Sequence, residues 1–132
     1  MKPPLRVLVV DDEAPIRRTL ERALARKGHT VMVASSGEAA CSVLAAQQVD
    51  AILLDLRMPT MSGQTLYHVI LSQWPALADK VIIMSGDPDA GDHDGWLEIY
   101  DLPVVPKPFE LESVYTALDD LVAGRRNRAR GD

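Results

Sequence analysis

The sequence predicts an α/β fold in which helices cover both faces of a single parallel sheet. Short apolar runs rich in valine and isoleucine alternate five times with longer segments whose apolar residues recur at helical spacing. Each run carries at most one charged residue, and such mostly apolar runs are typical of parallel strands buried on both faces. Each connection is long enough to hold the helix that parallel neighbours require.

The apolar runs place the strands. Strands are expected at residues 5–10, 30–34, 50–54, 80–84 and 104–105. Acidic or other polar residues follow most of these runs directly. A compact run that stops at a polar residue is typical of a buried strand that ends in a loop. We therefore expect the polar residues to collect at one edge of the sheet.

Helix signals occupy the intervening segments. Pro15 suits a first helical turn, and Gly28 suits the end of the same helix. Either Ser35 or Ser36 is expected to cap the second helix. Pro75 is expected to end the third, and the last helix is expected at 110–123. The helix before residue 100 is expected to be short or frayed, because prolines and glycines precede it.

Right-handed crossovers leave few topologies for this pattern. Among them the sequence favours the flavodoxin-like, doubly wound, five-stranded parallel sheet with strand order 2-1-3-4-5 and five helices. The length of 132 residues suits one domain, expected at 1–123. Residues 124–132 contain four arginines without apolar periodicity and are expected to form a basic, disordered tail or linker stub.

Composition narrows the functional class. The net charge of −5 argues against nucleic-acid binding by this domain. Cys41 is the single cysteine, so no internal disulfide can form, which suits a reducing cytosol. No apolar run approaches the length that spans a membrane. We therefore expect a cytoplasmic domain without a membrane partner.

Three acids follow strands that this topology makes neighbours. Asp11 and Asp12 follow the first strand, and Asp55 follows the third. In such sheets ligands bind beyond the carboxyl ends of the strands, at the point where strand order reverses. Carboxylates this close repel each other unless a cation lies between them. Mg²⁺ is the expected cation, with the backbone carbonyl of Arg57 as a further ligand.

Two more polar groups are expected at the same edge. Ser85 follows the fourth strand and offers a hydroxyl, and Lys107 follows the fifth and offers an ammonium. Acids, a metal, a hydroxyl and a cation together suit attack by a carboxylate, Asp55, on a phosphoryl group. Ser85 and Lys107 would then stabilise the phosphoryl oxygens.

Taken singly, these residues have simpler interpretations. The acids at 11–13 are suited to solvating a loop, and Asp55 or Ser85 to forming a turn. Lys107, between two prolines, suits an exposed surface. Their common position at the ends of four strands favours one shared site over four coincidences.

With these motifs in place, the sequence closely resembles the receiver domain of two-component response regulators over residues 5 to about 123. The matching segments read VLVVDDE (7–13), ILLDLRMPTMSG (52–63), VIIMSG (81–86) and PKPF (106–109). The resemblance implies that a histidine kinase or histidine phosphotransfer protein phosphorylates Asp55. It implies that Asp11, Asp12, Asp55 and the Arg57 carbonyl position Mg²⁺. It also implies that Ser85 and Lys107 contact the phosphoryl group and that the Lys107–Pro108 bond is cis.

One position departs from the family pattern. Where many receivers carry a switch aromatic residue, this chain has Val104, which has no ring to move. We therefore expect output to come from ordering of residues 87–100. Arg57 and Asp87 each lie two residues past a site residue, and we expect an ion pair between them to screen the phosphoryl group from water.

Three other functional classes have related folds or chemistry. A pseudo-receiver would share the fold and bind partners without being phosphorylated. A phosphatase with an aspartate nucleophile needs a second acid two residues later, where this chain has Arg57. Nucleotide binding is disfavoured because neither GxGxxG nor GxxxxGK[ST] occurs. The expected protein is a phosphoacceptor and not an enzyme acting on a separate substrate.

Overall fold

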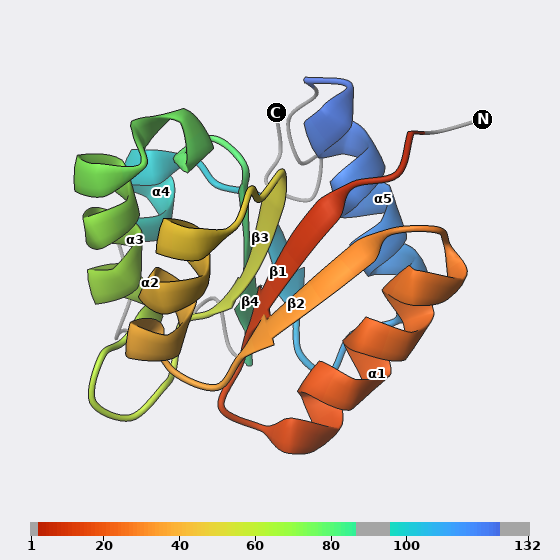
Figure 1. Cartoon of the computed structure of the whole chain (residues 1–132), viewed down its shortest axis with the longest axis horizontal. Helices are drawn as coiled ribbons and strands as arrows, with labels where there is room; N and C mark the ends of the chain where they lie inside the picture. The colour runs from red at the N-terminus through yellow and green to blue at the C-terminus, as the bar shows by residue number, and fades with distance from the viewer. Residues whose placement is uncertain (1–2, 87–95, 125–132) are drawn as a thin grey trace.

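The computed structural model describes residues 3–86 and 96–124 and contains one five-stranded sheet (Figure 1). The strands are β1 (Arg6–Val10), β2 (Thr30–Ala34), β3 (Ala51–Asp55), β4 (Val81–Ser85) and β5 (Val104–Pro106). Every adjacent pair is parallel, and the order is β2-β1-β3-β4-β5. The predicted order 2-1-3-4-5 is therefore confirmed.

Helices cover both faces of the sheet. They are α1 (Ala14–Arg26), α2 (Gly37–Ala46), α3 (Gly63–Gln73), α4 (Trp96–Tyr100) and α5 (Leu111–Val122), with a 3₁₀ turn η1 (Pro75–Leu77). Helices α2, α3 and α4 lie on one face, and α1 and α5 lie on the other (Figure 1). The described part of the chain thus has the five helices expected, and none of them is long and apolar enough to cross a membrane.

The helix ends follow local signals. Pro15 lies in the first turn of α1, and Gly28 adopts φ = 94° just beyond its end, where a side chain would be strained. Of the two candidate caps, Ser36 is the one that accepts a hydrogen bond, from the N–H of Ala39. Pro75 follows α3 as expected, but it also begins the turn η1, which the sequence did not predict.

Three strands, β3, β4 and β5, end one residue later than predicted. Asp55 is still inside β3, where it is the register partner of Met84. Ser85 is still inside β4, opposite Pro106. The polarity of these residues suggested loops, but the backbone ladder continues through them, and both are buried. Their side chains are therefore fixed by the sheet itself.

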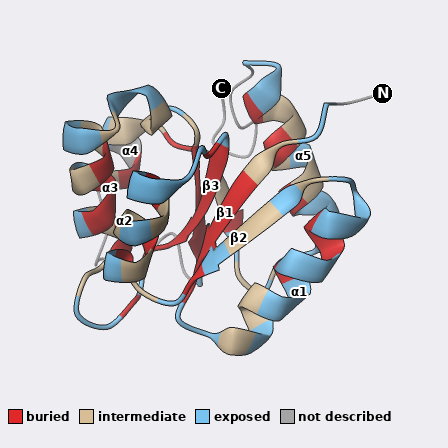
Figure 2. Cartoon of the chain, in the orientation of Figure 1, coloured by how far each residue is buried: buried red, intermediate tan, exposed pale blue. Residues whose placement is uncertain are grey.

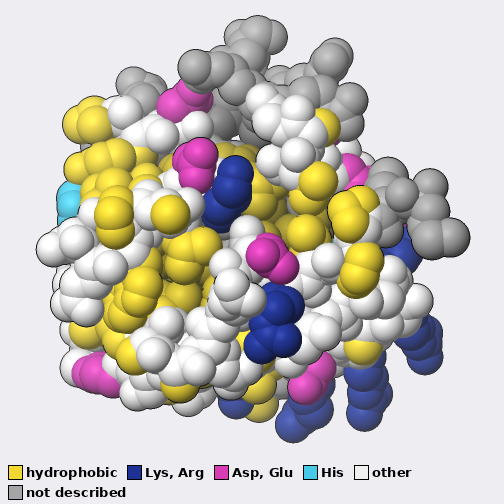
Figure 3. Space-filling view, turned by 45° about the horizontal axis from the view of Figure 1, so that its top comes forward, with side chains coloured by type: hydrophobic (Ala, Val, Ile, Leu, Met, Phe, Trp, Pro, Cys, Tyr) yellow, Lys and Arg dark blue, Asp and Glu magenta, His cyan; other side chains and the backbone are white. Residues whose placement is uncertain are grey.

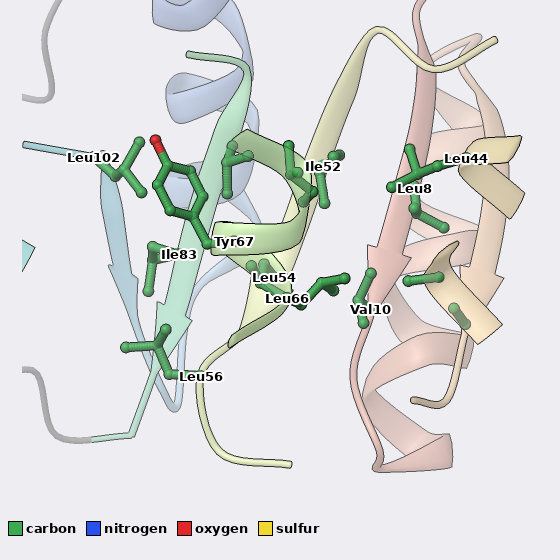
Figure 4. Close-up of a cluster of buried hydrophobic side chains, with 14 of the residues drawn as sticks. Leu8, Val10, Leu44, Ile52, Leu54, Leu56, Leu66, Tyr67, Ile83 and Leu102 are labelled. Atoms are coloured by element: carbon green, nitrogen blue, oxygen red, sulfur yellow. The ribbon is translucent and has the colours of Figure 1, made fainter. Parts of the chain in front are cut away.

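The sheet separates two hydrophobic cores. On the side of α2, α3 and α4, the core includes Leu8, Ile52, Leu66 and Tyr67 (Figure 4). On the other side, alternate strand residues pack against α1 and α5. All residues of β3 and β4 are buried, whereas the edge strand β2 is partly exposed (Figure 2). The central strands, which carry Asp55 and Ser85, are therefore the most enclosed.

Aromatic rings join α4 to α3. Tyr67, His68, Trp96 and Tyr100 have ring centroids between 5.2 and 6.3 Å apart. Trp96 Nε1 also donates a hydrogen bond to His68 Nε2, at 3.2 Å. We call these four residues the aromatic cluster. Helix α4 has five residues; the remainder of the expected ordering segment, 87–95, lies outside the described residues.

Candidate functional site

Three carboxylates meet where β1 and β3 end. Asp11, Asp12 and Asp55 each place an oxygen within 4.8 Å of the others. Asp11 follows β1, whose last residue Val10 pairs with Leu54, so the acids of two adjacent strands arrive side by side. Asp11 and Asp55 are buried at 0% and 4% exposure, whereas Asp12 is exposed. The group thus has a buried floor and an open side.

Hydrogen bonds hold Asp11 in place. Its N–H donates to the carbonyl of Ala34 at the end of β2, at 3.1 Å. Its own carbonyl accepts from Arg17 Nη1 at 2.8 Å, and its Oδ1 accepts from the N–H of Glu13 at 2.9 Å. Asp11 is therefore held by the first turn of α1 on one side and by the end of β2 on the other.

Asp55 is positioned by the loop that follows it. The N–H of Arg57 donates to Asp55 Oδ1 at 3.2 Å, which brings Arg57 back towards the carboxylate. Gly63 N–H donates to the carbonyl of Leu56 at 3.0 Å and closes the loop at the start of α3. Met61 packs closely against Gly37 of α2. This loop is therefore fixed at both ends and at its middle.

Lys107 reaches the carboxylates from β5. Its Nζ lies 2.7 Å from Asp11 Oδ2, 3.6 Å from Asp55 Oδ2 and 3.5 Å from Glu13 Oε1. Its N–H donates to the carbonyl of Ser85 at 2.7 Å, which ties the lysine to the end of β4. The Lys107–Pro108 bond is cis, as the resemblance implied. An ammonium that follows β5 is therefore held against the acids, although β5 is not adjacent to β1 or β3.

The electrostatics of the site follow from burial and proximity. Burial, together with the negative charge of Asp11, raises the pKa of Asp55 from 3.8 to about 6, although Lys107 and the Arg57 N–H oppose the change. Burial lowers the pKa of Lys107, but the hydrogen bond to Asp11 and the charge of Asp55 outweigh it, so this pKa is raised. The positive charge near Asp55 is thus too small to offset the cost of ionising this buried carboxylate.

The donor set fits Mg²⁺. It consists of carboxylate oxygens, two of them buried, which are the hard ligands that this ion takes while keeping several waters. A divalent cation at this group would offset the repulsion that raises the pKa of Asp55. The backbone of Arg57 lies next to the group, held to Asp55 by its N–H.

One further position singled out by the sequence lies apart from this group. Val104 begins β5, where it pairs with Ile83 and packs, partly buried, against the core beside α2, α3 and α4. Asp87, the expected partner of Arg57, lies outside the described residues. Two contacts were not foreseen, those of Glu13 with Lys107 and of Arg17 with Asp11. No spacing in the sequence signals either contact, because Lys107 follows a distant strand and Asp11 is bonded through its backbone carbonyl.

A separate pocket lies away from the carboxylate group. A pocket of about 420 Å³ lies where β4 and β5 begin, lined in part by Tyr67, Lys80, Tyr100 and Leu102. Figure 3 is turned towards this side of the molecule and shows hydrophobic side chains between scattered charged ones. The carboxylate group lies at the opposite edge of the sheet, where β1 and β3 end.

Fold and site together define a class of protein: a doubly wound α/β domain with acids, a hydroxyl and a lysine at the carboxyl edge of its sheet. Residues 7–119 match the family model of the response regulator receiver domain. The chain therefore belongs to the response regulator receiver family of two-component signalling.

Curated relatives extend beyond this chain. It is 30% identical over 122 residues to the DNA-binding transcriptional regulator NtrC of Proteus hauseri, covering 92% of this chain and 25% of that protein. It is 29% identical over 119 residues to the response regulator MprA of Mycolicibacterium vanbaalenii, covering 90% of this chain and 51% of that protein. The chain thus spans between a quarter and about half of these relatives.

Solved receiver structures share the fold across their whole length. A response regulator receiver protein from Pseudomonas putida superimposes with a TM-score of 0.80 at 28% identity, over 91% of this chain and 99% of that one. The response regulator TrrA of Thermotoga maritima, solved in complex with Mg²⁺-BeF, gives 0.76 at 25% identity, over 89% of this chain and 98% of that one.

Proposed function

We propose that this domain accepts a phosphoryl group on Asp55 in a Mg²⁺-dependent reaction, with a phosphohistidine of a histidine kinase or histidine phosphotransfer protein as donor. The observation that carries the proposal is the three-carboxylate group with the Lys107 ammonium 3.6 Å from Asp55 Oδ2. Acids at this distance need a cation between them, and a carboxylate beside both a metal and an ammonium is equipped to attack phosphorus.

The reaction forms one bond and breaks one. An oxygen of Asp55 attacks phosphorus, and the bond between phosphorus and the donor histidine nitrogen breaks. The nitrogen takes up a proton from water, which leaves an acyl phosphate and a neutral histidine. Mg²⁺, when bound, neutralises charge on the phosphoryl oxygens. Asp11 and Asp12, with Asp55 and the Arg57 carbonyl, are the groups that would hold it.

In this proposal Ser85 and Lys107 stabilise the phosphoryl oxygens that Mg²⁺ does not contact. Ser85 is buried at the end of β4, and its carbonyl is tied to the Lys107 N–H. Its hydroxyl would donate to one phosphoryl oxygen, and the lysine would swing from Asp11 to another. Because strands and loops hold the backbone of these residues before the donor arrives, catalysis in this proposal is mostly positioning and charge neutralisation.

Phosphorylation would switch a surface rather than start a metabolic reaction. We propose that the α4-β5-α5 face changes its interactions with an output partner when the Ser85 hydroxyl engages the phosphoryl group. Val104 at the start of β5 would take part through packing, because it offers no ring. We propose a cytoplasmic location, where such a donor would meet the domain. In this proposal the domain turns over its own acyl phosphate and no separate substrate.

Intact-mass measurement tests the proposal. The chain is incubated with acetyl phosphate and Mg²⁺, and a gain of one phosphoryl group is expected. Asp55→Asn should show no gain, and chelation with EDTA should abolish it in the wild type. A wild-type chain that gains no phosphate under these conditions, while remaining folded, would make this a pseudo-receiver and end the proposal.

A further inference from the structure

The Glu13 side chain lies beside the site, but it neither caps helix α1 nor belongs to the group of three carboxylates. It occupies the N-cap position of α1, yet its side chain makes no capping hydrogen bond. Its main chain is fixed, because its N–H donates to Asp11 Oδ1 and its carbonyl accepts from the N–H of Arg17. Its carboxylate instead lies 3.5 Å from Lys107 Nζ. The side chain is therefore directed to the lysine.

The two partners differ in their access to solvent. The Glu13 side chain is 60% exposed and that of Lys107 is 14% exposed, so the carboxylate covers the ammonium from the outside. Glu13 is not among the acids that cluster within 4.8 Å of one another. Its negative charge is thus directed at the lysine rather than at the metal position.

We propose that Glu13 is a positioning residue that competes with the phosphoryl group for Lys107. This competition lowers the stability of the phosphorylated state. This inference rests on the proposed function. The ammonium has three N–H donors, and in the unphosphorylated site it faces the carboxylates of Asp11, Asp55 and Glu13. When Asp55 carries a phosphoryl group, the lysine must turn towards the new oxygens.

Glu13 opposes that turn in two ways. It attracts the ammonium outwards, and it places a negative charge near an anionic phosphoryl group. Asp11 and Asp55 also face the ammonium, but both belong to the acidic group that a cation would neutralise. Glu13 lies outside that group, so its charge remains. Because it is largely exposed, water and salt weaken the effect, which we expect to be a few-fold change in affinity.

The test uses beryllofluoride with Mg²⁺ as a stable stand-in for the phosphoryl group, bound to the whole 132-residue chain. Affinity is measured by ¹⁹F NMR for the wild type and for Glu13→Gln, which keeps the side-chain shape and removes the charge. We expect about threefold tighter binding by Glu13→Gln at low salt, and a ratio that falls towards one near 1 M salt. A purely structural role for Glu13 would not give this salt dependence.

Glu21→Gln is the matched control, since it removes an equal charge from the exposed face of the same helix. It should bind beryllofluoride as the wild type does. If Glu13→Gln binds no more tightly than the wild type, or if both variants tighten equally, the inference is overturned. If the wild type neither binds beryllofluoride nor gains phosphate, the proposed function fails first, and the two failures are thus distinguished.

Discussion

The backbone of Gly63 lies directly against the carbonyl of Asp55. A Cβ atom added at Gly63 would collide with the Asp55 carbonyl oxygen and would stand 2.7 Å from the Cα of Leu56. Both obstacles are backbone atoms, and the Gly63 N–H is already bonded to the Leu56 carbonyl. The first residue of α3 therefore presses on the end of the strand that carries the proposed phosphoacceptor.

Gly63→Ala should accordingly destabilise the fold. The backbone of β3 cannot move aside without disturbing its pairing with β1 and β4, so we expect a loss of about 1–3 kcal/mol in the free energy of unfolding. Urea unfolding measures this loss. Gly86→Ala is the matched control, because a Cβ there meets nothing within 4 Å. Equal midpoints for the two variants would contradict the close approach.

Asp55→Asn should stabilise the metal-free protein at neutral pH. The pKa of Asp55 is raised to about 6 in the folded state, mainly by burial. From about pH 4 to 6 the folded chain therefore binds more protons at this group than the unfolded chain, and the contribution of Asp55 to stability falls as pH rises. In EDTA at pH 7.5 the variant should gain about 1–3 kcal/mol.

At pH 4 that gain should largely disappear, because Asp55 is then protonated in the folded protein. Urea midpoints at the two pH values give the comparison. Asp79→Asn is the control, since the Asp79 side chain is 79% exposed and its contact with Lys80 is long, at 3.8 Å. Its effect should be small and similar at both pH values. A gain for Asp55→Asn that does not change with pH would refute the raised pKa.

Mg²⁺ should raise the melting temperature of the wild type. At ten times the dissociation constant, a ligand that binds only the folded state adds about 1.4 kcal/mol, or roughly 4 °C for a domain of this size. Asp12→Asn should lose most of this shift, because Asp12 belongs to the acidic group yet is exposed and not part of the core. Differential scanning fluorimetry in EDTA and in Mg²⁺ measures the shift, and Glu21→Gln should retain it.

His68→Ala should weaken the packing of α4 against α3. His68 accepts the Trp96 indole hydrogen bond at 3.2 Å and adds a ring to the aromatic cluster. With Trp74→Phe as background, Trp96 is the remaining tryptophan of the chain. Its emission should shift to longer wavelength and its quenching by acrylamide should increase when His68 is removed.

His29→Ala in the same background is the comparison. His29 accepts a hydrogen bond from the N–H of Leu5, away from the aromatic cluster. Its loss should leave the Trp96 emission unchanged. An unaltered spectrum for His68→Ala as well would show that the aromatic cluster does not hold α4.

Strand positions were predictable because their signals are local, and the strand order followed from the few topologies that right-handed crossovers allow. Apolar runs mark buried strands, and Ser36 and Gly28 mark helix ends, by properties of the few residues around them. The strand ends were predicted one residue early at Asp55 and Ser85, because polarity suggested a loop where the ladder continues. The turn η1 was not predicted, because a proline after a helix signals the end of that helix and not the 3₁₀ turn that follows.

The sequence by itself determined which chemical groups reach the carboxyl edge of the sheet, since residue type and strand order are enough to place Asp11, Asp55 and Lys107 there. Only the tertiary structure decided which of these groups form close ion pairs. The lysine lies nearer to Asp11 than to Asp55, and Glu13 covers it from outside. Such distances depend on how loops from separate strands approach one another in space, and no local pattern of residues encodes that approach.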